Sequence, residues 1–342
     1  MRTTAFIALM FLLFACQKEE SSTTPAATAE EKLLRIPDGF PEMPFPEGNE
    51  LTQSRWNLGK KLFYEKRLSI DQSISCGSCH QPSLAFADDL ALSPGVFNRA
   101  GTRNTPSLAN VGYHPYLLRE GSVPTLEMQV LVPIQEHNEF NHNVVNIVDM
   151  LKQDSAYAKM SLEAYERPFD GFVLTRAISV FQRTMVSGNS AYDQYAFQNN
   201  TTALGTTEKK GMELFFSNKT NCSGCHSGFN FTNYNFENNG LDSIYADNGR
   251  FRLTNDSVDE ALFKIPSLRN IGLTAPYMHD GRFTTLEEVI DHYNSGGQNH
   301  RNKSNLIQPL QLSQTEKTEL IAFLNSLTDY SFINDSKWQE DE

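Results

Sequence analysis

Apolar side chains recur at intervals of three and four residues over several stretches of the chain. The clearest stretches are residues 144–152, 171–184 and 315–327, and this spacing predicts helices with one buried face. Alternation of apolar and polar positions, which is typical of strands, is rare and short. The pattern therefore predicts a mainly α-helical protein with few short strands.

The first 16 residues differ, because Arg2 precedes an apolar run that ends at Cys16. This is the pattern of an export signal, and the run is too short to span a membrane comfortably. Its last four residues, LFAC, are similar to a lipoprotein cleavage site, so we expect a mature chain that begins at a lipidated Cys16. Cleavage of an ordinary signal peptide nearby is the alternative.

Residues 17–33 are polar and lack periodicity, which predicts a flexible tether, with folding expected to begin near Leu34. Together with the export signal, the tether predicts a lipoprotein that is periplasmic or at the cell surface. We expect the lipid to anchor the protein to the outer membrane and to be its only contact with a membrane.

Beyond the tether, the sequence repeats itself. Residues 106–112 (PSLANVG) return 160 positions later as residues 266–272 (PSLRNIG), and the same offset pairs Gly121 with Gly281. A Thr-Leu-Glu sequence, which is typical of a helix start, also recurs at this offset. We infer a duplication that produced two domains. The expected domains are residues 34–195 and residues 196–342.

Each expected domain carries one Cys-x-x-Cys-His motif. The motif residues are Cys76, Cys79 and His80 in the first domain and Cys222, Cys225 and His226 in the second. In such a motif the two thiols form thioethers with the heme vinyl groups, and the histidine binds the iron. One motif alone also occurs at other metal or redox sites. Two motifs in an exported chain whose only other cysteine is Cys16 indicate two covalently bound hemes c.

Composition excludes some classes of function. A chain of 342 residues, with 39% hydrophobic and 20% charged residues, is long enough for two globular domains. The formal net charge of −12 argues against nucleic-acid binding and favours basic or neutral protein partners.

Four further segments, together with the heme motifs, resemble the bacterial diheme cytochrome c peroxidases and their MauG-like relatives. The segments are residues 58–63 (LGKKLF), 103–107 (RNTPS), 263–270 (FKIPSLRN) and 274–281 (TAPYMHDG). The resemblance covers residues 50–328 and implies an oxidoreductase of the cytochrome c peroxidase type. It also implies that the N-terminal heme is catalytic and that the C-terminal heme supplies it with electrons.

In that family a glutamine and a glutamate ten residues apart lie over the open face of the N-terminal heme, and Gln129 and Glu139 match them. By this resemblance Glu139 takes a proton from one peroxide oxygen and delivers it to the other, while Gln129 orients the peroxide or its water. Glu136 is a competing carboxylate, and a solvated surface acid is the alternative interpretation of Glu139.

Two positions depart from the pattern of the typical peroxidases. Val96 stands where they have a loop histidine that binds the resting iron, so we expect a first heme that is five-coordinate or water-bound. Tyr293 stands where many of them have a methionine ligand and where MauG-like enzymes have tyrosine, so we expect it to bind the second iron. A phenolate favours ferric iron. Met278 and His292 are the alternative ligands, and a core role for the Tyr293 ring is a further alternative.

The family also binds a calcium ion between the hemes, through an asparagine side chain and two backbone carbonyls. Asn104, Thr274 and Pro276 match these positions, and oxygen ligands suit calcium. By the same resemblance, His279 is expected beside this region. Arg119 stands where the family commonly has a tryptophan between the hemes, and this exchange removes an aromatic relay for electrons.

The resemblance favours reduction of hydrogen peroxide to water at the His80 heme. The electrons would come from a small exported donor such as a cytochrome c or a cupredoxin. Val96 and Tyr293 favour the alternative of a MauG-like oxidase that acts on a protein or a small organic substrate. A pure electron-transfer cytochrome is a third hypothesis, and it requires both irons to be six-coordinate. The resemblance leaves a homodimer open.

Overall fold

The computed structural model describes residues 29–340 of the chain. The predicted export signal, Cys16 and most of the predicted tether therefore lie outside the described residues. The first described helix, α1 (Ala29–Leu33), occupies the last five residues of the predicted tether. Leu33 is buried in a hydrophobic core, so ordered structure begins slightly earlier than the sequence predicts.

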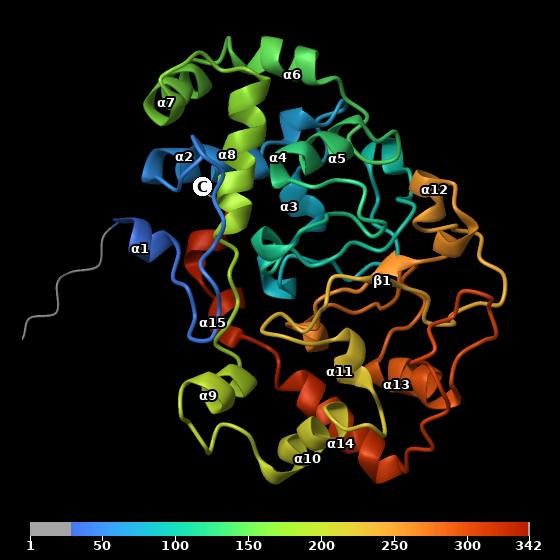
Figure 1. Ribbon diagram of the computed structural model, residues 1–342. Helices are drawn as coiled ribbons and strands as arrows, with labels where there is room; N and C mark the ends of the chain where they lie inside the picture. Colours follow the sequence, from blue (N-terminus) through green and yellow to red (C-terminus); the bar gives the residue numbers. More distant parts are fainter. Residues whose placement is uncertain (1–28, 341–342) are drawn as a thin grey trace, which may run out of the picture.

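The described residues are mainly helical, as the sequence predicts (Figure 1). The helices that follow α1 are α2 (Gln53–Phe63), α3 (Cys76–Cys79), α4 (Leu126–Gln129), α5 (Leu131–Gln135), α6 (Val144–Leu151), α7 (Ser155–Tyr165), α8 (Gly171–Arg183), α9 (Ala191–Phe197), α10 (Thr206–Phe215), α11 (Cys222–Cys225), α12 (Phe251–Thr254), α13 (Leu286–Ser295), α14 (Gln314–Asn325) and α15 (Tyr330–Ile333). Two short strands, β1 (Phe236–Glu237) and β2 (Phe263–Lys264), form an antiparallel pair. The three helices predicted from periodicity are confirmed as α6, α8 and α14.

Side-chain caps fix where the longer helices begin. The Asp170 carboxylate accepts a hydrogen bond from the Val173 amide at the start of α8. Ser313 and Glu316 form a reciprocal capping box at the start of α14. Such caps satisfy backbone donors that would otherwise lack partners at a helix start. Most of α8 is buried, and this helix runs through the first half of the molecule (Figure 1).

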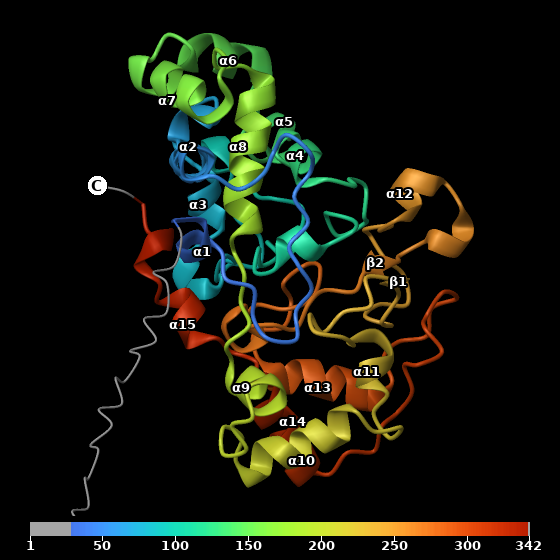
Figure 2. The same cartoon turned by 60° about the vertical axis from the view of Figure 1, so that its left-hand side comes forward.

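Each half contains a close helix pair that places its heme motif. Helix α2 packs on α8, and α10 packs on α14, and both views show these pairs side by side (Figure 2). A Cβ atom on Gly59 would lie 2.0 Å from the Ala177 carbonyl oxygen, and one on Gly211 would lie 1.8 Å from that of Glu319. Only glycine permits such close approach of two backbones. In both halves the helix that precedes the heme motif is therefore docked in the same way.

Loops that match in sequence also match in backbone conformation. Asn110 and Asn270, 160 positions apart, both adopt left-handed conformations, with φ of 60° and 59°. The isolated bridge between Leu117 and Val123 returns at the same offset between Tyr277 and Phe283. These correspondences support the inferred duplication, which stays a prediction.

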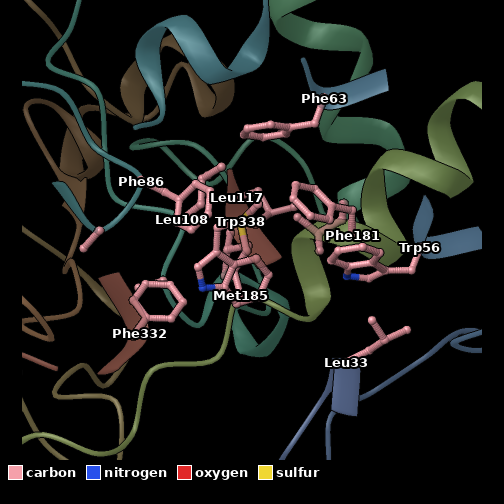
Figure 3. Close-up of a cluster of buried hydrophobic side chains, with 14 of the residues drawn as sticks. Leu33, Trp56, Phe63, Phe86, Leu108, Leu117, Phe181, Met185, Phe332 and Trp338 are labelled. Carbon is pink, nitrogen blue, oxygen red and sulfur yellow. The ribbon is translucent and has the colours of Figure 1, made fainter. Parts of the chain in front are cut away.

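The C-terminal segment crosses from the second half to the first. Phe332 and Trp338 pack in one core cluster with Phe63, Phe86 and Phe181 (Figure 3). The Tyr64 hydroxyl donates a hydrogen bond to the Trp338 carbonyl. Helix α14 packs on the second half, but the residues after it complete the core of the first half. The expected division at residues 195 and 196 therefore does not describe where the C-terminal segment packs.

Within residues 29–340, every helix is too short or too polar to cross a membrane.

Candidate functional site

The first heme motif lies on a single helical turn followed by a constrained histidine. Helix α3 carries Cys76 and Cys79, and neither thiol is in a disulfide. The Nδ1 atom of His80 lies 2.8 Å from the Phe86 carbonyl oxygen. Because a carbonyl only accepts, Nδ1 carries the proton, and the lone pair of Nε2 is left for a metal.

The second motif repeats this arrangement. Helix α11 carries Cys222 and Cys225 as free thiols, and Nδ1 of His226 lies 3.0 Å from the Phe231 carbonyl oxygen. Burial lowers the pKa of both His80 and His226, which favours the neutral, ligating form. In both motifs the residues present fit a covalently held heme with an axial histidine.

A cavity of about 370 Å³ lies over the first motif, and it is lined by Cys76, Cys79 and His80. Its volume is in the range of small-molecule sites. Lys264 and Arg119 line the same cavity. Among the described residues, no carboxylate forms an ion pair with either cation, and their nearest polar partners are His114 and Asn104, respectively. Two half-buried basic groups without an anion suit the carboxylate groups that a heme carries.

Two of the residues expected over the first heme, Gln129 and Glu139, line this cavity. Glu139 remains accessible from the cavity, yet the surrounding protein desolvates its carboxyl and raises the pKa to about 7, with a second contribution from the Glu136 charge. Glu136 lines the cavity too, but its carboxylate accepts a hydrogen bond from the Asn138 amide at 3.4 Å. No hydrogen bond from another described side chain or amide reaches the Glu139 carboxyl, which favours Glu139 over Glu136 as the proton acceptor.

Backbone hydrogen bonds fix the segment that carries Glu139. The Val96 amide donates to the Glu139 carbonyl at 2.9 Å, and the Ile70 amide donates to the Phe140 carbonyl at 3.0 Å. The Val96 side chain is fully buried. A Cβ atom on Gly95 would lie 1.9 Å from the Asn138 carbonyl oxygen. The loop in which the typical peroxidases have a ligand histidine is therefore packed directly against the Glu139 segment.

Two of the three candidate ligands for the second iron, Tyr293 and Met278, lie close to the side-chain amide of Asn239. The Nδ2 atom of Asn239 lies 3.4 Å from the Tyr293 hydroxyl oxygen and 3.3 Å from the Met278 sulfur. Burial raises the pKa of Tyr293 to about 12, and the neighbouring thiols of Cys225 and Cys222 add to the rise. The phenol thus lies near the second heme motif. Ligation by Tyr293 or by Met278 stays a prediction.

His292, the third alternative, is engaged elsewhere. Its Nε2 atom lies 3.1 Å from the Asn239 carbonyl oxygen, and a nitrogen that donates to a carbonyl has no free lone pair for iron. This contact excludes ligation through Nε2 and leaves only the lone pair of Nδ1, so ligation by His292 also stays a prediction.

The residues expected to bind calcium do not fit a calcium ion. Asn104, Thr274 and Pro276 line the same cavity, but the Asn104 side-chain oxygen accepts a hydrogen bond of 2.8 Å from the Arg119 guanidinium. A calcium ion on that oxygen would stand beside a fixed positive charge. His279 lies next to this region, where its carbonyl accepts from the Asn104 amide.

Sequence reasoning missed a pair of basic side chains in the cavity wall. The Lys264 ammonium lies 2.7 Å from Nδ1 of His114. Burial lowers the pKa of Lys264 to about 7, and the Arg119 charge adds to the effect. Burial also lowers the pKa of His114. The two residues are 150 positions apart, so no local pattern joins them.

Comparisons with known proteins agree with this geometry. The family model described as di-haem cytochrome c peroxidase matches residues 53–202. Methylamine utilization protein MauG of Methylorubrum extorquens is 34% identical over 322 residues, which is 93% of this chain and 90% of that protein. Cytochrome-c peroxidase IdrP1 of a Pseudomonas species is 33% identical over 326 residues, with 84% of each chain covered.

A solved structure is also similar over most of its length. The crystal structure of a MauG-like protein associated with microbial copper homeostasis is 34% identical, with a TM-score of 0.84, and the match covers 89% of this chain and 98% of that one. The sequence identity, the fold and the two heme motifs therefore agree. The chain belongs to the di-haem cytochrome c peroxidase family, a family of oxidoreductases that carry two c-type hemes.

Proposed function

We propose that the protein reduces hydrogen peroxide to water in the cavity over His80. The observation that carries this proposal is the Glu139 carboxyl, which lines the same cavity as His80 and has a pKa of about 7. A carboxyl group with a pKa near neutral pH is suited both to accept a proton and to return it.

A heme held by Cys76, Cys79 and His80 would bind the peroxide and supply the electrons that break its O–O bond. The residues of the chain handle the protons. The Glu139 carboxylate takes the proton from one peroxide oxygen and returns it to the other, which leaves as water. The Gln129 amide both donates and accepts hydrogen bonds, so it suits the task of orienting the peroxide. One peroxide, two protons and two electrons give two waters.

The second half supplies the electrons in this proposal. A heme held by Cys222, Cys225 and His226 would accept them from a small exported donor, a cytochrome c or a cupredoxin. The net charge of −12 supports a basic docking face on that donor.

The test uses the heme-loaded protein, hydrogen peroxide and a reduced donor. We expect saturable donor oxidation with a c-type cytochrome or a cupredoxin. Glu139→Gln should abolish most of this turnover at unchanged heme content, whereas Glu136→Gln should retain most of it. Equal losses in the two variants would contradict the role of Glu139, and absence of turnover with every donor would contradict peroxide reduction itself.

A second candidate is peroxide-driven oxidation of a protein or small organic substrate. Support comes from Val96 and Tyr293, and from the similarity to the MauG protein of Methylorubrum extorquens and to the MauG-like structure. This reaction would consume peroxide with an added phenol or partner protein and without a reduced cytochrome. Fast donor-supported turnover together with methionine ligation of the second heme would exclude it.

We also propose that the protein is an exported lipoprotein held at Cys16. The support is the sequence pattern of residues 1–16. Cys16→Ala should move the heme-loaded protein from the membrane fraction to the soluble fraction. If the variant stays with the membrane, the anchor is not at Cys16.

A further inference from the structure

We propose that the Arg119 guanidinium is a built-in replacement for calcium at the contact between the two halves, so that this chain closes the region without a metal ion. The inference does not depend on which substrate the enzyme oxidises or reduces.

The first support is the geometry of the guanidinium on Asn104. Nη2 of Arg119 lies 2.8 Å from the Asn104 carbonyl oxygen and 2.8 Å from its side-chain oxygen, and Nε lies 3.1 Å from the carbonyl oxygen. The Asn104 side-chain nitrogen donates to the Leu90 carbonyl at 3.1 Å. This bond orients the amide so that its oxygen faces Arg119. One planar cation therefore engages both oxygens of the residue that was expected to bind calcium.

The second support is the position of this pair between the two halves. The Asn104 amide donates to the His279 carbonyl at 2.8 Å, and the Lys264 amide donates to the Arg119 carbonyl at 2.6 Å. Both members of the pair are thus tied by their backbones to the second half. Thr274 and Pro276 line the same cavity. The guanidinium therefore lies where segments of the two halves meet, which is also where an ion bound to Asn104, Thr274 and Pro276 would lie.

The third support is charge. A guanidinium carries a positive charge throughout the neutral pH range. A divalent ion on the Asn104 side-chain oxygen would be repelled by this charge and would have to displace the hydrogen bond that this oxygen accepts from Nη2. The arginine that stands at the tryptophan position thus supplies the cation as well as removing the aromatic ring.

The test compares calcium dependence in the heme-loaded wild type and in Arg119→Ala. Calcium content is measured after gel filtration, and the unfolding temperature is measured with EGTA and with added calcium chloride. We expect wild-type protein without stoichiometric calcium and with the same unfolding temperature in both conditions. Arg119→Ala frees both Asn104 oxygens, so its unfolding temperature should rise with calcium, by about 2–4 °C at saturating ion.

Arg252→Ala is the matched control, because Arg252 also lines the cavity, is exposed, and makes no hydrogen bond to Asn104. This variant should remain insensitive to calcium. One calcium per wild-type chain, with a lower unfolding temperature in EGTA, would overturn the proposal. A folded Arg119→Ala protein that ignores calcium would overturn it as well. If Arg119→Ala does not fold, the wild-type measurement alone decides.

Discussion

The Val96 backbone amide donates a hydrogen bond of 2.9 Å to the Glu139 carbonyl. The loop that carries an iron ligand in the typical peroxidases therefore supports the segment of Glu139, the proposed proton acceptor, in this chain. Because the Val96 side chain is fully buried, its packing holds the loop in place. The position of Glu139 depends on this loop.

The close approach of Gly95 to Asn138 gives a direct test of that dependence. Gly95→Ala would place a methyl group 1.9 Å from the Asn138 carbonyl oxygen, so the segment that carries Glu139 must move. We expect peroxide turnover to fall about 100-fold, as for a small misplacement of a catalytic group, at unchanged heme content. Gly101→Ala is the control, because its methyl group would meet the Ser93 carbonyl oxygen at 3.2 Å. Equal turnover in the two variants would argue against the support role.

Removing the Glu139 carboxyl tests the proton transfer itself. Glu139→Gln keeps the size of the side chain but cannot accept and return a proton. We expect kcat/KM for peroxide to fall by about 10²–10⁴-fold, the usual contribution of general acid–base catalysis. Stopped-flow mixing of the heme-loaded protein with peroxide measures this step without a donor. A fall of less than about tenfold would mean that another group moves the proton.

The raised pKa of Glu139 predicts the pH profile. The carboxylate form accepts the proton, so kcat/KM should rise with pH up to about 7 and then level off. Glu139→Gln should lose this rise. The same shift has the opposite effect on stability, which decreases as pH rises. The folded protein binds the Glu139 proton more tightly than the unfolded chain does, because folding raises the pKa from 4.5. Through this group alone, the free energy of unfolding should fall as pH rises from 4.5 to about 7. A pH-independent kcat/KM would contradict the assignment.

Two variants separate the ligands considered for the second iron. Tyr293→Phe removes the phenol oxygen and should change the absorption spectrum of the oxidised second heme and raise its reduction potential, because a phenolate favours ferric iron. Met278→Leu removes the sulfur and should leave both unchanged. The reverse pattern would identify Met278 as the ligand.

Trp338 tests the contribution of the C-terminal segment to the first half. Its side chain is 1% exposed, and its ring nitrogen has no hydrogen-bond partner among residues 29–340, so packing accounts for its effect. Trp338→Ala should lower the free energy of unfolding by about 3–5 kcal/mol, the cost of a large core cavity. Denaturant titration measures this value. Tyr330→Ala, which removes a ring that is 66% exposed in α15, should have little effect, and similar losses in both would contradict the packing account.

Local patterns were sufficient for much of the fold. The helical periodicity located α6, α8 and α14, and the spacing of each heme motif fixed its cysteines and histidine. Contacts between segments that are distant in the sequence produce no such local pattern. The approach of Lys264 to His114 and the docking of Trp338 against Phe86 depend on tertiary packing. Arg119 is a further example. The sequence showed that it replaces a tryptophan, but it did not predict the hydrogen bonds to Asn104.

The docking of the C-terminal segment sets an order of events in the maturation of the protein. Chains fold from the N-terminus as they emerge, so the first heme motif arrives long before Phe332 and Trp338. Cys76 packs against the cluster that these two residues complete. The core beside Cys76 therefore stays open until the C-terminal segment, which is made late in synthesis, has docked on the first half.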